Sequence, residues 1–213
     1  MLQLPLKKDA KKVGIMGGTF DPIHLGHLVT AEEARQQFNL NYVVFVPSGH
    51  PPHKDNVLVS DMEHRYLMTV LAVITNPHFT VSRVEIERSL KGGPTYTVDT
   101  VKWFQDFFGP QTRLHFITGA DAMLDILTWK DYEHLLDTCQ FIAASRPGYS
   151  FSRLRKTLDR PGSSILDKVY YLEIPAMAIS STAIRERVRS GKTIKYLTPE
   201  AVEHYIIKNK LWK

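Results

Sequence analysis

The sequence predicts an α/β protein with an open parallel sheet, helices on both faces of the sheet and a small helical part at the C-terminal end. Short apolar, β-branched runs alternate with segments of helical periodicity along the 213 residues. One of these runs, residues 42–46, is apolar throughout, as a strand covered on both faces would be. The hydrophobic fraction of 43% is that of an ordinary globular chain, so a packed core is expected.

In the N-terminal half, the pattern predicts a strand at 13–16, a helix at 28–38, a strand at 42–46, a loop at 47–59, a helix at 61–75, a strand at 79–86 and a helix at 96–108. Asp61 is a candidate N-cap for its helix. In that helix Met62, Arg65, Met68 and Ala72 fall on recurrent turns. A loop as long as 47–59 is often functional in a compact domain.

In the C-terminal half, the pattern predicts strands at 114–118, 141–144 and 169–173 and helices at 182–189 and 199–208. Gly109 and Pro110 end the helix that precedes them. Residues 150–165 are polar and predicted to be irregular, which sets a soft boundary between residues 1–150 and residues 151–213. We expect the two parts to form one structural domain.

Composition excludes several classes of protein. The chain contains no apolar run near the roughly 20 residues that span a bilayer. Residues 1–12 are basic but lack the apolar core of a signal peptide. The single cysteine, Cys139, lies in an apolar run and is expected to be a buried thiol. These features predict a cytoplasmic protein that does not associate with membranes.

The formal charge of +5 is consistent with a nucleic-acid surface or with a small anionic substrate. Lys and Arg are spread along the chain instead of forming a run of five or more, and acidic residues interrupt the densest region, 185–213. We therefore expect an anionic small molecule and no nucleic acid. The sequence leaves a homo-oligomer open.

The most informative segment joins the first strand to the first helix and contains two glycines and the pattern His24-Leu25-Gly26-His27. In an open α/β sheet, ligands bind beyond the carboxyl ends of the strands. Gly17 and Gly18 let backbone N–H groups approach a ligand closely, and the following helix N-terminus favours phosphate. The segment matches neither a Walker A loop nor the dinucleotide pattern GxGxxG.

His24 and His27 are spaced so that both imidazoles can face one phosphate, with Gly26 keeping the space between them clear. Two other interpretations stay open. A single histidine is more often a cap or a core residue. The two histidines could also chelate zinc together with His50 and His53, although no Cys or acid completes a recognisable tetrahedral set.

A second anion site is predicted at the start of the helix that follows residue 180. Ser181 is a candidate N-cap. Residues 182–184 carry no acid, and Arg185 follows them. A cation near a helix N-terminus is favourable when an anion is bound there. The alternative is an ordinary capped amphipathic helix.

The chain resembles the bacterial nicotinate-nucleotide adenylyltransferases of the HxGH nucleotidyltransferase superfamily. Seven segments carry the resemblance in order along nearly the whole chain: Gly17–Pro22 with His24–His27, Pro51–Lys54, Pro94–Thr97 with Asp99–Thr100, Gly119–Asp121, Thr128–Trp129, Arg146–Gly148 and Ser180–Arg185. Two positions depart from the family pattern, namely Thr95 in place of a serine and Lys130 in place of an aromatic residue.

The resemblance implies a Rossmann-like nucleotidyltransferase fold and transfer of AMP from ATP to nicotinate mononucleotide. Residues 1–150 would form the nucleotide- and acceptor-binding core, and residues 151–213 would complete the ATP site. The implied ATP-binding set is Gly17, Gly18, Thr19, Phe20, His24, His27, Gly119, Asp121, Ile179, Ser181, Thr182 and Arg185. The implied acceptor-binding set is Lys54, Tyr96, Thr97, Trp129, Lys130 and Arg146.

Some of these residues also have ordinary structural interpretations. Asp121 could cap a helix, Lys54 could be a solvated loop lysine, and Arg146 could cap a helix or pair with a surface acid. Tyr96 and Trp129 could pack in the core.

In the implied reaction the acceptor phosphate attacks the α-phosphorus of ATP, so catalysis consists of positioning and charge stabilisation. His24, His27, Lys54 and Arg185 are the predicted catalytic residues. Mg²⁺ would arrive with ATP, with no metal site built from protein alone. Three alternatives remain: another phosphorylated acceptor such as nicotinamide mononucleotide or phosphopantetheine, a zinc hydrolase, and a nucleotide sensor without activity.

Overall fold

The computed structural model describes residues 9–49, 59–145, 151–159, 165–175 and 178–213. Within these ranges the chain forms a six-stranded sheet whose neighbouring strands are all parallel, in the order β3-β2-β1-β4-β5-β6. The strands are β1 (Lys12–Gly18), β2 (Tyr42–Pro47), β3 (Phe79–Val81), β4 (Arg113–Gly119), β5 (Gln140–Ser145) and β6 (Val169–Glu173). The predicted parallel α/β sheet is confirmed.

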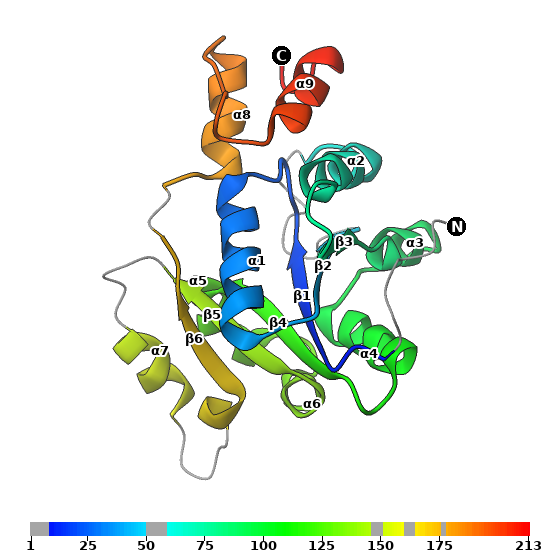
Figure 1. The fold of residues 1–213 in the computed structure, drawn as a ribbon, viewed down its shortest axis with the longest axis vertical. Coiled ribbons are helices and arrows are strands. Elements are labelled where there is room, and N and C mark those ends of the chain that lie inside the picture. The colour runs from blue at the N-terminus through cyan, green and yellow to red at the C-terminus, as the bar shows by residue number, and fades with distance from the viewer. Residues whose placement is uncertain (1–8, 50–58, 146–150, 160–164, 176–177) are drawn as a thin grey trace.

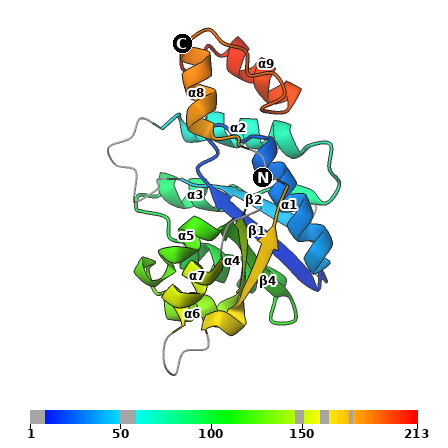
Figure 2. The same cartoon turned by 90° about the vertical axis from the view of Figure 1, so that its left-hand side faces the viewer.

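Helices cover both faces of this sheet (Figures 1 and 2). One face carries α1 (Leu25–Phe38) and α2 (Met62–Val73), and the other carries α4 (Thr97–Phe108), α5 (Ala120–Leu124), α6 (Tyr132–Thr138) and α7 (Phe151–Leu158). Successive side chains of a strand point to opposite faces. Val44 therefore packs in one core, whereas Val43 and Phe45 pack in the other.

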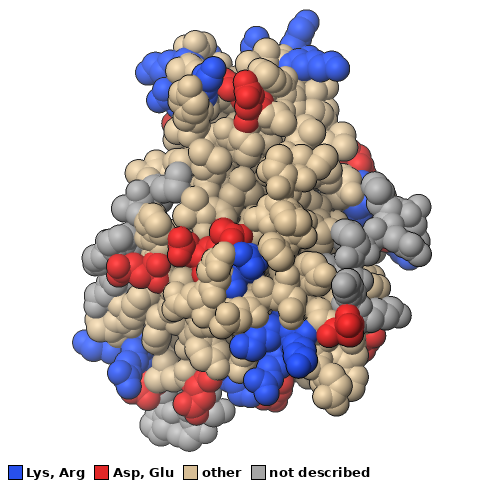
Figure 3. Space-filling model, viewed as in Figure 1, with Lys and Arg blue, Asp and Glu red and all other residues tan. Residues whose placement is uncertain are grey.

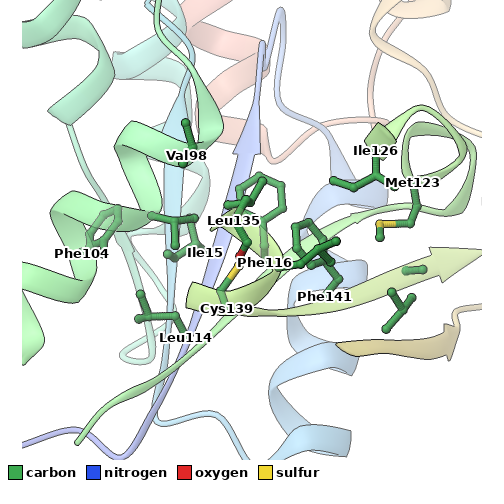
Figure 4. Packing of buried hydrophobic residues seen from close by; sticks show 14 of the residues in the cluster. Ile15, Val98, Phe104, Leu114, Phe116, Met123, Ile126, Leu135, Cys139 and Phe141 are labelled. Carbon is green, nitrogen blue, oxygen red and sulfur yellow. Dashed lines mark hydrogen bonds between the residues drawn. The ribbon is translucent and has the colours of Figure 1, made fainter. Parts of the chain in front are cut away.

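The core under α4 to α7 combines aliphatic and aromatic side chains (Figure 4). Phe116 of β4 packs against Phe141 of β5, with ring centroids 5.7 Å apart, and Phe104 of α4 belongs to the same cluster. Cys139 is buried in the same cluster, as its apolar context predicts. Burial raises the pKa of the Cys139 thiol, so the thiol stays protonated and inert.

The last two helices, α8 (Ser181–Arg189) and α9 (Glu200–Lys208), lie at one end of the molecule, beyond the carboxyl edge of β1 (Figure 1). α9 packs against α2, where Tyr205 Oη lies 2.8 Å from His64 Nδ1. Trp212 Nε1 donates to Ser60 Oγ at 2.8 Å. The C-terminal segment is thereby fixed to α2 and to the residues just before it.

Two expectations about secondary structure are wrong. The predicted strand 79–86 ends at Val81, and residues 84–90 form α3 (Val84–Leu90). A short apolar run does not by itself distinguish a strand from a helix. Residues 151–158, expected to be irregular, form α7, which buries Leu154 and Leu158 on one face. The structure also contains α5, α6 and two short 3₁₀ helices, η1 (Ile126–Thr128) and η2 (Ile165–Lys168), which were not predicted.

On the face shown in Figure 3, Lys and Arg form several separate groups. The larger groups lie at the upper and lower ends, and a smaller one lies beside acidic residues near the middle. Among the described residues, no helix is both long and apolar enough to cross a membrane.

Candidate active site

The turn after β1 lies where the sheet reverses its strand order, between β1 and its neighbour β4. At such a switch point the helices leave in opposite directions and open a crevice. The two glycines that end β1 are required by their surroundings. A Cβ on Gly18 would lie 2.9 Å from the ring of Phe20, and one on Gly17 would lie 3.1 Å from the ring of Phe116. A side chain at either position would therefore crowd an aromatic ring.

Phe20 and Asp21 shape the turn that follows. Phe20 has a φ of 50°, and its side chain is buried, with the ring edge-on to that of His27 at 5.1 Å. Of the predicted ATP-binding groups, Phe20 therefore offers only its backbone to a ligand. The peptide bond between Asp21 and Pro22 is cis.

The two histidines stack on each other, with ring centroids 3.7 Å apart. His24 is the N-cap of α1, and its backbone N–H donates to His27 Nδ1 at 3.2 Å. Burial, assisted by the neighbouring His24, lowers the pKa of His27 to about 3. His27 is thus neutral at physiological pH, and because Nδ1 accepts a hydrogen bond, its proton is on Nε2. α1 begins at Leu25, earlier than the predicted residue 28.

α8 contacts this turn directly. Ser181 Oγ donates to the carbonyl of Pro22 at 2.9 Å, and Arg185 donates to the carbonyl of Asp21 at 2.6 Å. Arg185 also donates to Thr182 Oγ1 at 3.3 Å. The prediction that Ser181 caps α8 is wrong, because Ser180 is the N-cap and accepts from the N–H of Ala183. Ser181 is instead free to bridge the helix to the turn.

The remaining residues of the predicted ATP-binding set lie near this edge. Gly119 ends β4 and is the N-cap of α5, so the alternative that Asp121 caps a helix is wrong. Asp121 is exposed in the first turn of α5. Thr19 lies in the turn after β1, and Ile179 packs against the core cluster that includes Ile184.

Three members of the predicted acceptor-binding set, Tyr96, Thr97 and Lys130, lie together at the start of α4. Tyr96 is the N-cap of α4 and Thr97 its first residue. The ammonium of Lys130 lies 4.2 Å from the centre of the Tyr96 ring. Trp129 is half-buried and edge-on to Phe116 at 5.9 Å. Because Phe116 also faces Gly17, one aromatic ring links this group to the turn after β1. Lys54, His50, His53 and Arg146 lie outside the described residues.

Within the described ranges, no three His, Cys, Asp or Glu side chains are placed to hold a metal ion together. The zinc alternative also depends on His50 and His53, which are outside those ranges.

The structure adds two residues that the sequence did not assign to the site. Arg65 of α2 is buried and donates to the carbonyl of Thr19 in the turn. Glu85 of α3 is buried and accepts from Thr100 in the first part of α4. The sequence could have indicated a role for Arg65, since it is a charged residue on the otherwise apolar stripe of its helix. It gave no such indication for Glu85, because the segment of Glu85 was predicted to be a strand.

Residues 15–187 match the cytidylyltransferase-like family. The chain is 55% identical over 202 residues, 95% of its length and 94% of the relative, to a probable nicotinate-nucleotide adenylyltransferase of Thermoanaerobacter sp. (strain X514). It is 56% identical to a protein of the same name from Moorella thermoacetica, again over 95% of its length and 92% of the relative.

The fold is also similar to that of a solved structure, Plasmodium falciparum nicotinic acid mononucleotide adenylyltransferase complexed with NaAD. The TM-score is 0.72 at 23% identity, with 95% of this chain and 97% of that chain covered.

Proposed function

The chain belongs to the cytidylyltransferase-like family, among the nicotinate-nucleotide adenylyltransferases, and on this premise we propose which of its residues carry out the reaction. The enzyme transfers AMP from ATP to nicotinate mononucleotide and releases pyrophosphate. The product is deamido-NAD, so the reaction is a step in NAD biosynthesis.

The observation that carries the assignment of the ATP site is the contact between α8 and the turn after β1. The first turns of α1 and α8 both lack acidic residues, and the hydrogen bonds of Ser181 and Arg185 hold the start of α8 against the turn that leads into α1. Two helix N-termini therefore flank one place, and the positive end of a helix favours an anion. A triphosphate fits such a pair of positive helix ends better than any neutral ligand does.

In the proposed mechanism, an oxygen of the acceptor phosphate attacks the α-phosphorus of ATP. A new P–O bond forms, the bond between the α-phosphorus and the bridging oxygen breaks, and pyrophosphate leaves. The nucleophile is already ionised at neutral pH, so no general base is needed. The enzyme must place the reactants in line and stabilise the charge on the phosphoryl oxygens. We assign the second task to His24, His27 and Arg185, with the neutral His27 donating from Nε2.

The acceptor site is proposed at the N-terminus of α4. Trp129 would stack on the pyridine ring, and donors from Tyr96, Thr97 and Lys130 would bind the carboxylate. Tyr96 makes no side-chain cap bond, so the first N–H groups of α4 are available to an anion. The ammonium of Lys130, held over the Tyr96 ring, adds positive charge at the same place. Lys54 and Arg146 complete the proposed set on the basis of the family motifs.

We further propose that ATP is used as its magnesium complex. Mg²⁺ prefers oxygen ligands and keeps several waters, so phosphate oxygens can supply most of its coordination.

A pyrophosphate-release assay with magnesium and ATP against a panel of phosphorylated acceptors tests the proposal. We expect release with nicotinate mononucleotide and formation of deamido-NAD. Release only with phosphopantetheine would assign a different acceptor. Binding of ATP without release of pyrophosphate with any acceptor would indicate a sensor.

A further inference from the structure

One buried guanidinium connects three separate segments of the chain. Arg65 is 2% exposed, and its three nitrogens all donate to backbone carbonyls. The carbonyl of Thr19, in the turn after β1, accepts at 2.9 Å. The carbonyls of Gly49 and Ser60 each accept at 3.0 Å. Gly49 and Ser60 lie on either side of the sequence segment that contains Lys54.

The free-energy cost of burying the Arg65 charge indicates that this side chain serves to fix the positions of its three carbonyl partners. Burial lowers the pKa of Arg65, which means that its charged form is disfavoured at this position, and the carboxylates of Asp21, Asp61 and Glu85 only partly compensate. An apolar side chain of similar size at such a position is often as stabilising as a buried charge. An apolar side chain, however, cannot donate to three carbonyls at fixed angles. The planar guanidinium can, because its donors form a rigid fork.

Gly49 is fixed from a second direction by α3. A Cβ at this position would lie 2.5 Å from the backbone oxygen of Glu85 and 2.6 Å from Ser89 Cβ, so only glycine allows this approach. The backbone of Gly49 also hydrogen-bonds the buried carboxyl of Glu85, while burial raises the pKa of that carboxyl. Gly49 is therefore held by α3 as well as by Arg65.

Glu85 continues the connection to α4. Thr100 Oγ1 donates to Glu85 Oε1 at 2.8 Å, and Thr100 is 1% exposed. Arg88, one turn along α3, donates to Thr100 Oγ1 and to the carbonyl of Asp99. The first turns of α4, which begin at the proposed acceptor site, are thus linked through Glu85 and Gly49 to Arg65 and the turn after β1.

We infer that Arg65 and Glu85 are positioning residues that set the distance between the ATP turn and the acceptor end of α4. This inference rests on the proposed function, because it assigns the two ends of the network to the two substrates. Neither residue touches a reacting atom. Their contribution is to keep the acceptor phosphate in line with ATP, where a misplacement of about 1 Å can lower the rate about 10²-fold.

The experiment compares Arg65→Lys and Glu85→Gln with the unmodified enzyme. Steady-state kinetics with nicotinate mononucleotide give kcat and both KM values, and a titration gives the Kd of ATP. We expect kcat to fall between about tenfold and 10²-fold in each variant, with the Kd of ATP changed by less than about threefold. Because both residues hold Gly49, the double variant should lose less than the product of the single losses.

Met68→Ala is the matched control. Met68 lies on the same helix and is fully buried, so its truncation destabilises the fold without removing a polar link. It should lower Tm and leave kcat per folded molecule unchanged. If Arg65→Lys does not fold, Gly49→Ala carries the test, since the added methyl group displaces the same junction.

Unchanged kcat in folded variants, or additive losses, would overturn the positioning role while the unmodified enzyme remains active. Absence of the reaction in the unmodified enzyme would instead overturn the proposed function.

Discussion

The backbone N–H of His24 donates to Nδ1 of His27, three residues along the same turn, and the two rings stack. This bond fixes the tautomer of His27, because an accepting Nδ1 leaves the proton on Nε2. The imidazole is therefore a neutral donor whose orientation is set before a substrate arrives. Preorganisation of this kind gives a donor much of its effect on a charged transition state.

His27→Ala should lower kcat about 10²-fold or more, the range for losing one preorganised donor to a developing oxyanion. His64→Ala, which removes a histidine that contacts Tyr205 instead of the turn, should retain near-normal kcat and serves as the control. Steady-state assays and circular dichroism measure activity and folding. A His27→Ala enzyme with normal kcat would remove this side chain from the mechanism.

Stability should decrease as the pH falls below about 6.5, the ordinary pKa of histidine. The pKa of His27 is lowered to about 3 in the folded protein, so between about pH 6.5 and 3 the unfolded chain binds a proton that the folded chain does not. Burial lowers the pKa of His115 as well, with an effect of the same sign. Urea unfolding from pH 4 to 7 should show a smaller pH dependence in His27→Gln than in the unmodified protein. Equal slopes would contradict a neutral His27.

Arg185→Lys should impair turnover substantially although it keeps the positive charge. The guanidinium donates to both the Asp21 carbonyl and Thr182 Oγ1, and a single ammonium cannot reproduce that fork. Arg189→Lys, at the exposed C-terminal end of the same helix, is the matched control and should be neutral. Full activity of Arg185→Lys would show that the residue acts only as a distant charge.

Removal of divalent metal should abolish activity, and magnesium should restore it. The ion is expected to enter with ATP, so the purified enzyme should contain no stoichiometric zinc. Activity after EDTA treatment and readdition of each metal, together with elemental analysis, makes the comparison. About one tightly bound zinc per chain would favour the zinc interpretation of His24 and His27.

Nicotinate mononucleotide should be preferred over nicotinamide mononucleotide by at least about 10²-fold in kcat/KM. Donors from Tyr96, Thr97 and Lys130 suit a carboxylate, because charge-assisted hydrogen bonds are roughly twice as strong as neutral ones. An amide would place its NH₂ against donors, which costs about 1–3 kcal/mol for each unpaired group. Competition assays with the two mononucleotides measure the ratio. Equal use of both would contradict the proposed acceptor pocket.

Trp129→Ala should raise the KM of the acceptor much more than that of ATP, since the indole is proposed to stack on the pyridine ring. Trp103→Ala is the control, because Trp103 lies on the exposed side of α4 and stacks on Phe107 instead. A defect of Trp129→Ala confined to ATP would place Trp129 outside the acceptor site.

The sequence predicts most of the sheet because the central strands are short, apolar and buried over consecutive residues, as residues 42–46 illustrate. It singles out the turn after β1 as a candidate site because Gly17, Gly18, His24 and His27 lie within one short segment. It fails at α3, where Val84 and Ile86 are spaced as in a strand but Glu85 between them is also buried. Local spacing cannot reveal a polar side chain whose partners are distant in the sequence.

The N-cap of α8 is a second case in which local sequence does not reveal a distant partner. Ser180 and Ser181 are adjacent and chemically identical, and both types of role suit a serine. In the structure Ser180 caps the helix, and Ser181 donates to the carbonyl of Pro22, which lies 159 residues earlier in the sequence. A prediction of this kind requires the tertiary structure.

The bond between Arg185 and the Asp21 carbonyl spans 164 residues and has a consequence for how the protein is made. All six strands of the sheet end by Glu173, whereas α8 starts at Ser181. All six strands can therefore be present in a chain that still lacks α8, which holds half of the proposed nucleotide site. ATP stabilises only a chain that can bind it. Cellular ATP would thus favour completed molecules over those whose synthesis stopped after the last strand.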